Sequence, residues 1–251
     1  MKKILLVGES WTSQSTHFKG FDAFQSVYYE LGATSFVDSL KDNFDINYMP
    51  SHIASTDFPS TLSELEKYDC VIISDCGANT LLLHPDVFLR GKTFPNRLKL
   101  IEDFVNKGGS FVMFGGYLSF QGINGSARYK NTPIERILPV NILPYDDRIE
   151  APEGCEPIVK NKHTILNDIN GKWPSLLGIN QVETKQDDKI KTILTTNIDG
   201  NEYPLLVISE KNLGKTAVWT SDVGPHWLPM DFVEWEGYKT LWNNLFNWLT
   251  D

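Results

Sequence analysis

Four short polar segments of the chain could carry chemistry, because each directly follows an apolar run that has the pattern of a buried strand. They are residues 8–11, 75–79, 115–119 and 222–227. Loops that only turn a chain are dominated by Gly, Asn, Ser and Pro, whereas these segments contain acids, amides, hydroxyls, a histidine and two tryptophans. If the preceding strands are parallel, their carboxyl ends meet at one edge of the sheet, here called the crest. We therefore expect a small-molecule site at the crest.

His226 is the best candidate for acid–base chemistry, because imidazole is the side chain that ordinarily titrates near neutral pH. Asp222 and Asp75, which begin two of the four segments, are its expected catalytic partners. The alternatives are that His226 is a structural, hydrogen-bonded histidine and that the two aspartates cap helices.

Other polar and aromatic residues in or near these segments are expected to contact the ligand: Glu9, Ser10, Trp11, His17, Asn79, Gly116, Tyr117, Ser119, Gln121 and Trp227. His17 belongs to this set because we expect the long loop after the first strand to fold over the crest. The aromatic rings would stack on an apolar ligand face while acids and amides bind hydroxyls, which suits a sugar or a similar polyol.

The three cysteines, Cys70, Cys76 and Cys155, show no paired spacing, so neither a disulfide framework nor a structural zinc site is predicted. Cys76 stands where a nucleophile could be presented, but Asp75 beside it disfavours a thiolate, and we interpret Cys76 as a core residue. A mixed ligand set for zinc or manganese is chemically possible, although no spacing demands it: Glu9, His17, Asp75, Asp222 and His226. No glycine-rich phosphate signature occurs, and we predict no metal and no cofactor.

The charge balance argues against two classes of partner. The chain carries 23 Lys and Arg against 32 Asp and Glu, a formal net charge of -9, whereas nucleic acids and anionic membranes bind clustered positive charge. The amino-terminal apolar run is too short for a signal peptide, and no stretch is long enough to span a bilayer. We expect a cytoplasmic protein that binds a small molecule, with self-association as an open possibility.

Apolar runs and helical periodicities alternate through the first half of the chain. Strands are predicted at residues 3–7, 46–49, 70–74 and 110–114, and helices at 22–31, 35–40, 62–68 and 96–107. Such alternation predicts right-handed crossovers and a parallel sheet between helical layers. Residues 145–192 are expected to form an irregular excursion without a core of their own. A hairpin at 192–196 and 205–209, a strand at 216–220 and a helix at 236–249 would complete one domain spanning residues 1–251.

Several segments together resemble the putative glutamine amidotransferase family, a group within the class I glutamine amidotransferase-like superfamily. They are residues 8–11, 17–22, 74–83, 115–122, 144–148, 220–222 and 225–227. The resemblance covers nearly the whole chain and implies a flavodoxin-like three-layer sandwich. A working enzyme of the superfamily uses a cysteine in a glycine turn, a histidine and a glutamate two residues beyond it. Here the matching turn at 114–119 has no cysteine, and Leu228 stands at the position of the glutamate, although His226 resembles the histidine.

Three functions are compatible with these residues. In the first, an amidotransferase-like protein without glutaminase chemistry binds or converts a small polar metabolite, with the backbone N–H groups of the glycine turn holding an anion or oxyanion beside Tyr117 and Ser119. In the second, His226 with Asp222 or Asp75 activates water as a hydrolase, with or without a metal. In the third, the aromatic crest is the interface of a non-catalytic oligomeric scaffold.

Overall fold

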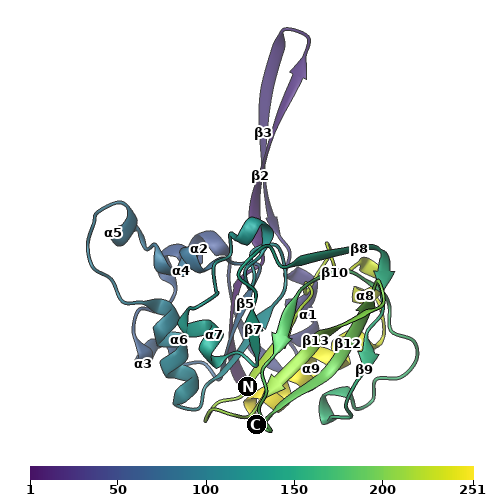
Figure 1. Cartoon of the computed structure of the whole chain (residues 1–251). Coiled ribbons are helices and arrows are strands. Elements are labelled where there is room, and N and C mark those ends of the chain that lie inside the picture. Colours follow the sequence, from purple (N-terminus) through teal and green to yellow (C-terminus); the bar gives the residue numbers. More distant parts are fainter.

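A computed structural model describes residues 1–251, and its centre is a mixed sheet of eight strands (Figure 1). In spatial order these are β4 (Phe44–Met49), β1 (Lys2–Gly8), β5 (Cys70–Ser74), β6 (Ser110–Phe114), β14 (Thr216–Trp219), β13 (Asn201–Ser209), β12 (Ile190–Ile198) and β9 (Ile158–Val159). The first five strands pair in parallel and the last three extend the sheet antiparallel. The chain therefore has an α/β fold in which the parallel strands end at one crest.

The central strands form because both of their faces are buried. Every residue of β5 and β6 is buried, and in β1 burial begins at Ile4. Continuous apolar runs without alternation are the pattern expected for such strands. The strands predicted at 3–7, 46–49, 70–74 and 110–114 are confirmed, although β4, at the edge of the sheet, alternates between buried and more exposed residues.

Helices cover the two faces of the sheet. Ile4 and Leu6 of β1 belong to a core with α1 (Thr34–Leu40) and α9 (Gly237–Thr250). Leu5 and Val7 point to the opposite core, which contains residues of α2 (Ser51–Asp57), α3 (Leu62–Leu65), α4 (Ala78–Leu82), α6 (Arg97–Asn106) and α7 (Pro133–Ile137). The predicted helices at 35–40, 62–68, 96–107 and 236–249 are confirmed with small shifts of their ends, and Thr61 and Glu64 form a capping box at α3.

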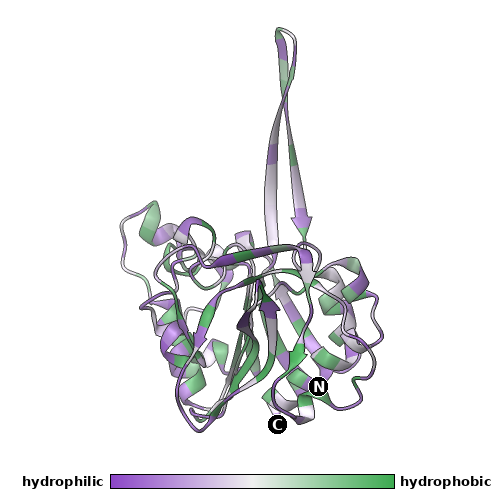
Figure 2. Ribbon diagram, turned by 45° about the vertical axis from the view of Figure 1, so that its right-hand side comes forward, coloured by the Kyte–Doolittle hydropathy of each residue, from purple (hydrophilic) through white to green (hydrophobic).

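Residues 10–31 form a long hairpin that projects from the crest, and we refer to it as the arm (Figures 1 and 2). Strand β2 (Ser10–Lys19) pairs with β3 (Asp22–Leu31) through ten consecutive residue pairs. The helix predicted at residues 22–31 is therefore wrong. Its apolar positions include Phe24, Val27 and Tyr28, whose aromatic or β-branched side chains favour strands, and pairing with β2 decides the outcome.

The region expected to be irregular carries more structure than predicted. Strand β8 (Arg148–Cys155) pairs with β10 (Leu176–Asn180), and β7 (Val140–Ile142) pairs with β11 (Val182–Thr184), each as a small antiparallel sheet. Short helical segments complete the chain: α5 (Pro85–Phe88), α8 (Met230–Val233), η1 (Ile123–Gly125) and η2 (Thr164–Leu166).

The carboxyl-terminal third follows the predicted pattern. The hairpin of β12 and β13 turns at Asp199 and Gly200, and β14 returns into the sheet between β13 and β6. None of the helices combines the length and the apolar character needed to cross a membrane.

Candidate functional site

Four loops meet at the crest and enclose a cavity of about 460 Å³. Its wall consists of Glu9, Trp11, Asp75, Tyr117, Leu118, Ile123, Asp222, Pro225 and His226. Each of the four polar segments named from the sequence contributes at least one of these residues. The parallel strands β1, β5, β6 and β14 place them there, because all four end at the same edge.

Two of the pocket acids lie on left-handed backbone. Glu9 follows the end of β1 with φ of 46°, and Asp75 follows the end of β5 with φ of 41°. Backbone hydrogen bonds hold the turn at Glu9: its N–H donates to the Ser74 carbonyl at 2.8 Å, and its carbonyl accepts from Gly32 at 2.9 Å. Non-glycine residues in this region carry strain that persists where surrounding structure imposes it, often at functional sites. The sheet thus aims both carboxyl groups at the cavity.

Burial favours the protonated forms of two pocket acids, Glu9 and Asp75. The pKa of Glu9 is raised well above its usual value, first by burial and then by the charges of Asp222 and Asp75. Burial also raises the pKa of Asp75 to about 6, although its carboxylate accepts the Leu118 N–H at 2.6 Å. Ser74 donates its hydroxyl hydrogen to Glu9. Neighbouring carboxylates in a shielded site cannot all ionise, so the cavity can both donate and accept protons near neutral pH.

His226 is oriented by a carboxylate behind it. Its Nδ1 lies 2.9 Å from Oδ2 of Asp222, and the same oxygen accepts the Trp227 N–H at 2.9 Å. This hydrogen bond to Asp222 raises the pKa of His226, and the charges of Asp222, Glu150 and Asp75 act in the same direction. The Nε2 atom makes no hydrogen bond within the chain, so a ligand can use it.

Gly116 allows the two aspartates to approach the turn after β6. Its φ is 131°, and a Cβ atom there would lie 2.8 Å from Oδ1 of Asp75 and 3.0 Å from Oδ1 of Asp222. Its N–H donates to Oδ1 of Asn180 at 2.9 Å, and the Leu118 N–H is held by Asp75. We expected the backbone N–H groups of this turn to hold an anion. This expectation is wrong for the N–H groups of Gly116 and Leu118, because both already donate to side chains of the protein. No α-helix follows the turn either, since residues 116–121 form turns and bends ahead of the short η1.

Two residues that the sequence did not single out as part of the site support Tyr117 and Trp227 without lining the cavity. Glu150 accepts hydrogen bonds from the Tyr117 hydroxyl at 3.1 Å and from Trp227 Nε1 at 2.9 Å. Arg148 lies over the Tyr117 ring at 5.1 Å. Both residues belong to β8, in the segment expected to be irregular, and the resemblance extended to Arg148 without assigning it a role. Leu118, Ile123 and Pro225 add apolar surface.

Three predicted contact residues support the pocket from behind. The Ser10 hydroxyl oxygen accepts the Ser51 N–H at 2.8 Å, and the Ser119 hydroxyl oxygen accepts the Asp75 N–H at 3.1 Å. Trp227 is 1% exposed and stacks against the His226 ring at 5.4 Å. Ser119 and Trp227 position Asp75 and His226, Ser10 joins the base of the arm to α2, and none of the three lines the cavity.

Three other predicted contact residues do not line the cavity. His17 lies on β2 of the arm, where it stacks on Phe24 at 4.6 Å and bonds Ser26, so the expectation that it folds over the crest is wrong. Asn79 is exposed on α4. Gln121 turns its amide toward the Gly125 carbonyl at 3.3 Å.

No thiol reaches the cavity. All three cysteines are free and buried, and Cys76 is 1% exposed in the core on the α6 side of the sheet. Burial raises the pKa of Cys76 to about 11, which agrees with its interpretation as a core residue. No three His, Cys, Asp or Glu side chains are arranged to hold a metal ion. The mixed ligand set considered from sequence does not form, since His17 lies on the arm.

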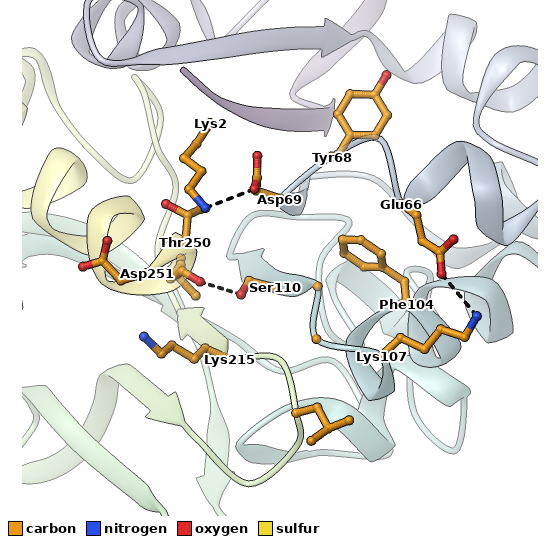
Figure 3. A pocket seen from close by; sticks show the side chains of 14 residues that line it. Lys2, Glu66, Tyr68, Asp69, Phe104, Lys107, Ser110, Lys215, Thr250 and Asp251 are labelled. Atoms are coloured by element: carbon orange, nitrogen blue, oxygen red, sulfur yellow. Dashed lines mark hydrogen bonds and ion pairs between the residues drawn. The ribbon is translucent and has the colours of Figure 1, made fainter.

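A second cavity, of about 410 Å³, lies at the opposite edge, where β1 and β6 begin (Figure 3). Its lysines are already engaged: Lys2 pairs with Asp69 at 3.3 Å, Lys107 with Glu66 at 3.2 Å, and Lys215 donates to the Trp248 carbonyl at 2.6 Å. This cavity offers no unpaired polar group comparable to His226. The crest pocket is the better candidate site.

Comparisons with known proteins agree with this architecture. The model of the putative glutamine amidotransferase family matches residues 3–251, and no curated protein matches the chain. Cytoplasmic protein STM3548 from Salmonella typhimurium is 41% identical with a TM-score of 0.92, and the match covers 98% of both chains. Cytoplasmic protein STM1381 from Salmonella typhimurium LT2 is also 41% identical, with a TM-score of 0.92 and coverage of 99% and 100%.

A more distant likeness concerns the fold alone. A thua-like protein from Bacteroides uniformis is 12% identical with a TM-score of 0.58, and the match covers 99% of this chain and 91% of that one.

Proposed function

The chain belongs to the putative glutamine amidotransferase family, and we propose that its crest pocket binds and converts a small, uncharged, hydroxyl-rich metabolite. The observation that carries this proposal is the pairing of His226 with Asp222 at 2.9 Å, with Nε2 left free beside a carboxyl that can hold a proton. The reaction class is proton transfer between ligand atoms or to and from water.

The lining supports a neutral ligand. Glu9, Asp75 and Asp222 make the cavity unfavourable for an anion, because a negative ligand would add to their mutual repulsion. Carboxyl groups accept hydrogen bonds from hydroxyls, and Trp11 and Tyr117 offer ring faces to an apolar ligand surface. A sugar or polyol can make both kinds of contact, since its hydroxyls bond the carboxyl groups and its apolar face stacks on the rings.

Two groups are suited to opposite roles in catalysis. His226 acts as the general acid through Nε2–H, because its raised pKa favours the imidazolium, and Asp222 fixes the ring and stabilises that charge. Asp75 acts as the general base, because its pKa of about 6 leaves the carboxylate in the majority near neutral pH with enough basicity to take a proton. Glu9 donates a hydrogen bond in its protonated form.

Glutamine hydrolysis by the cysteine route has no support in these residues. The turn after β6 contains Tyr117 where a nucleophile would stand, and Cys76 is buried away from the cavity. Leu228 is fully buried in the core with α9 and provides no carboxylate for His226. Asp222 holds the ring instead, four residues before it.

A hydrolase is the second candidate, because the same histidine and aspartate could activate a water. This alternative does not need an elaborate ligand site and would act on simple esters or glycosides. It is distinguished from the first proposal by product analysis.

The test is binding and turnover with a panel of sugars, polyols, amides and small carboxylates, read by tryptophan fluorescence and by product analysis. We expect neutral polyols to bind, and His226→Gln to lower turnover at least 100-fold while the melting temperature stays within about 2 °C. His52→Gln, an exposed histidine of α2, is the matched control and should leave both unchanged. Preferential binding of carboxylates, or full turnover in His226→Gln, would refute the proposal.

Three broader features are part of the same proposal. We infer a flavodoxin-like layout, because the five parallel strands follow the spatial order second, first, third, fourth, fifth. We treat residues 1–251 as one domain, supported by a family match over nearly the entire length. We also propose a cytoplasmic location, because both Salmonella proteins are described as cytoplasmic and the three cysteines are unpaired.

A further inference from the structure

The arm contributes nothing to the core of its own chain. None of residues 11–31 belongs to either hydrophobic core, and every residue of β3 is exposed or half-exposed. Large apolar side chains nevertheless occupy much of it: Phe18, Phe21, Phe24, Val27, Tyr28 and Tyr29. Phe18 is 78% exposed and Val27 is 63% exposed.

Both faces of the arm carry these residues. Cross-strand partners share a face, so Phe18, Val27 and Tyr29 lie on one side, while Phe24 and Tyr28 lie on the other with Trp11. Polar Ser, Thr and Gln side chains lie between them on both faces. Both faces of the arm therefore offer large apolar contacts to a partner.

The edges of the arm are also open. Strands β2 and β3 form a separate two-stranded sheet, so each has one edge without a partner. Natural edge strands are usually protected by proline, bulges or inward charges, yet the ten pairs run without a register shift and the arm contains no proline. An isolated two-stranded hairpin is marginally stable in water. Something outside the chain must stabilise this one.

The exposed area matches what a stable dimer needs. With aromatic side chains of 150–250 Å² each, the exposed fractions of the six large apolar residues amount to roughly 800 Å². A standard interface buries about 800 Å² on each partner, so the apolar side chains on the two faces and at the tip of the arm together provide enough area for one.

We propose that the arm docks on a second copy of this chain, and that two copies exchange arms about a two-fold axis. The same end of the molecule provides a receiving surface, because the arm rises from the crest next to α2, and α4 and α5 lie farther out at this end (Figure 1). Leu83, Phe88, Leu89, Leu118 and Tyr145 are exposed there. A two-fold interface requires such self-complementarity, in which one patch meets its counterpart on the partner.

The reach of the arm fits this arrangement. Ten residues at about 3.3 Å each give it a length of roughly 33 Å, enough to cross much of a neighbouring body. Trp11 at the base of the arm also lines the crest pocket, so the exchanged arms lie next to both pockets.

The test measures the mass of the full-length protein by light scattering after size-exclusion chromatography at micromolar concentration. The wild type should have twice the mass of one chain. Replacing residues 13–28 by Asn-Gly joins Thr12 to its cross-strand partner Tyr29 through a two-residue turn and should give a folded monomer. Leu213→Ser removes a side chain that is 82% exposed elsewhere on the surface, and should keep the dimer.

A second measurement does not depend on the shortened variant. Hydrogen exchange of amides in residues 10–31 should slow at least tenfold at high protein concentration and quicken on dilution. A monomeric wild type, a shortened variant with the full oligomeric mass, or exchange that is independent of concentration would each overturn the proposal.

Discussion

Half-buried Asp75 and buried Asp147 have similarly raised pKa values but differ in how many hydrogen bonds their carboxylates accept. Burial raises the pKa of each to about 6. Both oxygens of Asp147 accept N–H groups, from Gln121 at 2.8 Å and from Gly122 and Asn180 at 2.9 Å. Asp75 accepts one N–H, from Leu118 on Oδ1, and its Oδ2 faces no donor. Asp147 is therefore a structural anchor, whereas Asp75 keeps an oxygen available in the pocket.

We predict that Asp75→Asn stabilises the protein at pH 7.5 by on the order of 2 kcal/mol. The folded state binds the Asp75 proton more tightly than the unfolded state, because the pKa is about 6 rather than 3.8. Ionisation of Asp75 therefore destabilises the folded protein. This effect is absent below pH 3.8, grows between pH 3.8 and 6, and is complete above pH 6. The free energy of unfolding that Asp75→Asn gains over the wild type should therefore shrink as pH falls from 6 towards 4. Urea unfolding at several pH values measures it.

The matched control for that substitution is Asp147→Asn, which should destabilise by about 1–3 kcal/mol. An amide there would turn an NH₂ group toward a backbone N–H donor and lose one acceptor. Equal changes in the free energy of unfolding for Asp75→Asn and Asp147→Asn would show that burial alone, rather than hydrogen bonding, decides how each aspartate affects stability.

The predicted site residues separate according to how locally their positions are determined. Glu9, Asp75, Tyr117, Asp222 and His226 directly follow strands or lie in the turns after them, so the parallel arrangement alone was enough to bring them together. The use of Gly116 N–H by Asn180 could not be predicted, because that contact joins residues 64 positions apart through β10. Glu150 was not predicted as a site residue for the same reason, because its partners Tyr117 and Trp227 lie 33 and 77 positions away in the chain.

At the scale of elements, burial explains which predictions succeeded. Strands β1, β5 and β6 are continuous apolar runs buried on both faces, and this pattern has no competing interpretation at their length. Residues 22–31 also carry spaced apolar side chains, which favoured a helix in isolation. Their pairing with β2 is set by the two-residue turn at Gly20 and Phe21.

Arg97 joins three helices without a carboxylate partner. Its guanidinium donates to carbonyls in the last turns of α2 and α4: Ala54 at 3.1 Å, Ser55 at 3.0 Å, Thr80 at 3.1 Å and Leu81 at 2.6 Å. Burial lowers its pKa to about 10. The carbonyl ends of the helices carry partial negative charge, which compensates for burial of the cation.

We predict that Arg97→Lys lowers the free energy of unfolding by about 3 kcal/mol, because a single ammonium cannot reach all four carbonyls. Arg90→Lys is the control, since Arg90 makes an exposed ion pair with Asp86 and should change stability by no more than about 0.5 kcal/mol. Chemical denaturation with an unchanged slope measures both. A loss below about 1 kcal/mol in Arg97→Lys would mean that the helices hold their positions without this clamp.

At the scale of the whole molecule, the pocket and the arm share one end of the sheet. Glu9 ends the turn after β1, Ser10 begins the arm, and Trp11 belongs to both the arm and the cavity wall. The body is complete without the arm, because its two cores draw on residues outside 11–31. Stability of the body and association through the arm should therefore be separable.

This separation predicts a melting temperature that depends on protein concentration only when the arm is present. Association stabilises the folded state by mass action, so a hundredfold rise in wild-type concentration should raise the melting temperature by about 3 °C for a dimer of this size. The variant with residues 13–28 replaced by Asn-Gly should melt at one temperature over the same range. Leu213→Ser should follow the wild type. Scanning calorimetry at matched scan rates provides the measurement, and a concentration dependence that persists in the shortened variant would place the contact between copies elsewhere on the body.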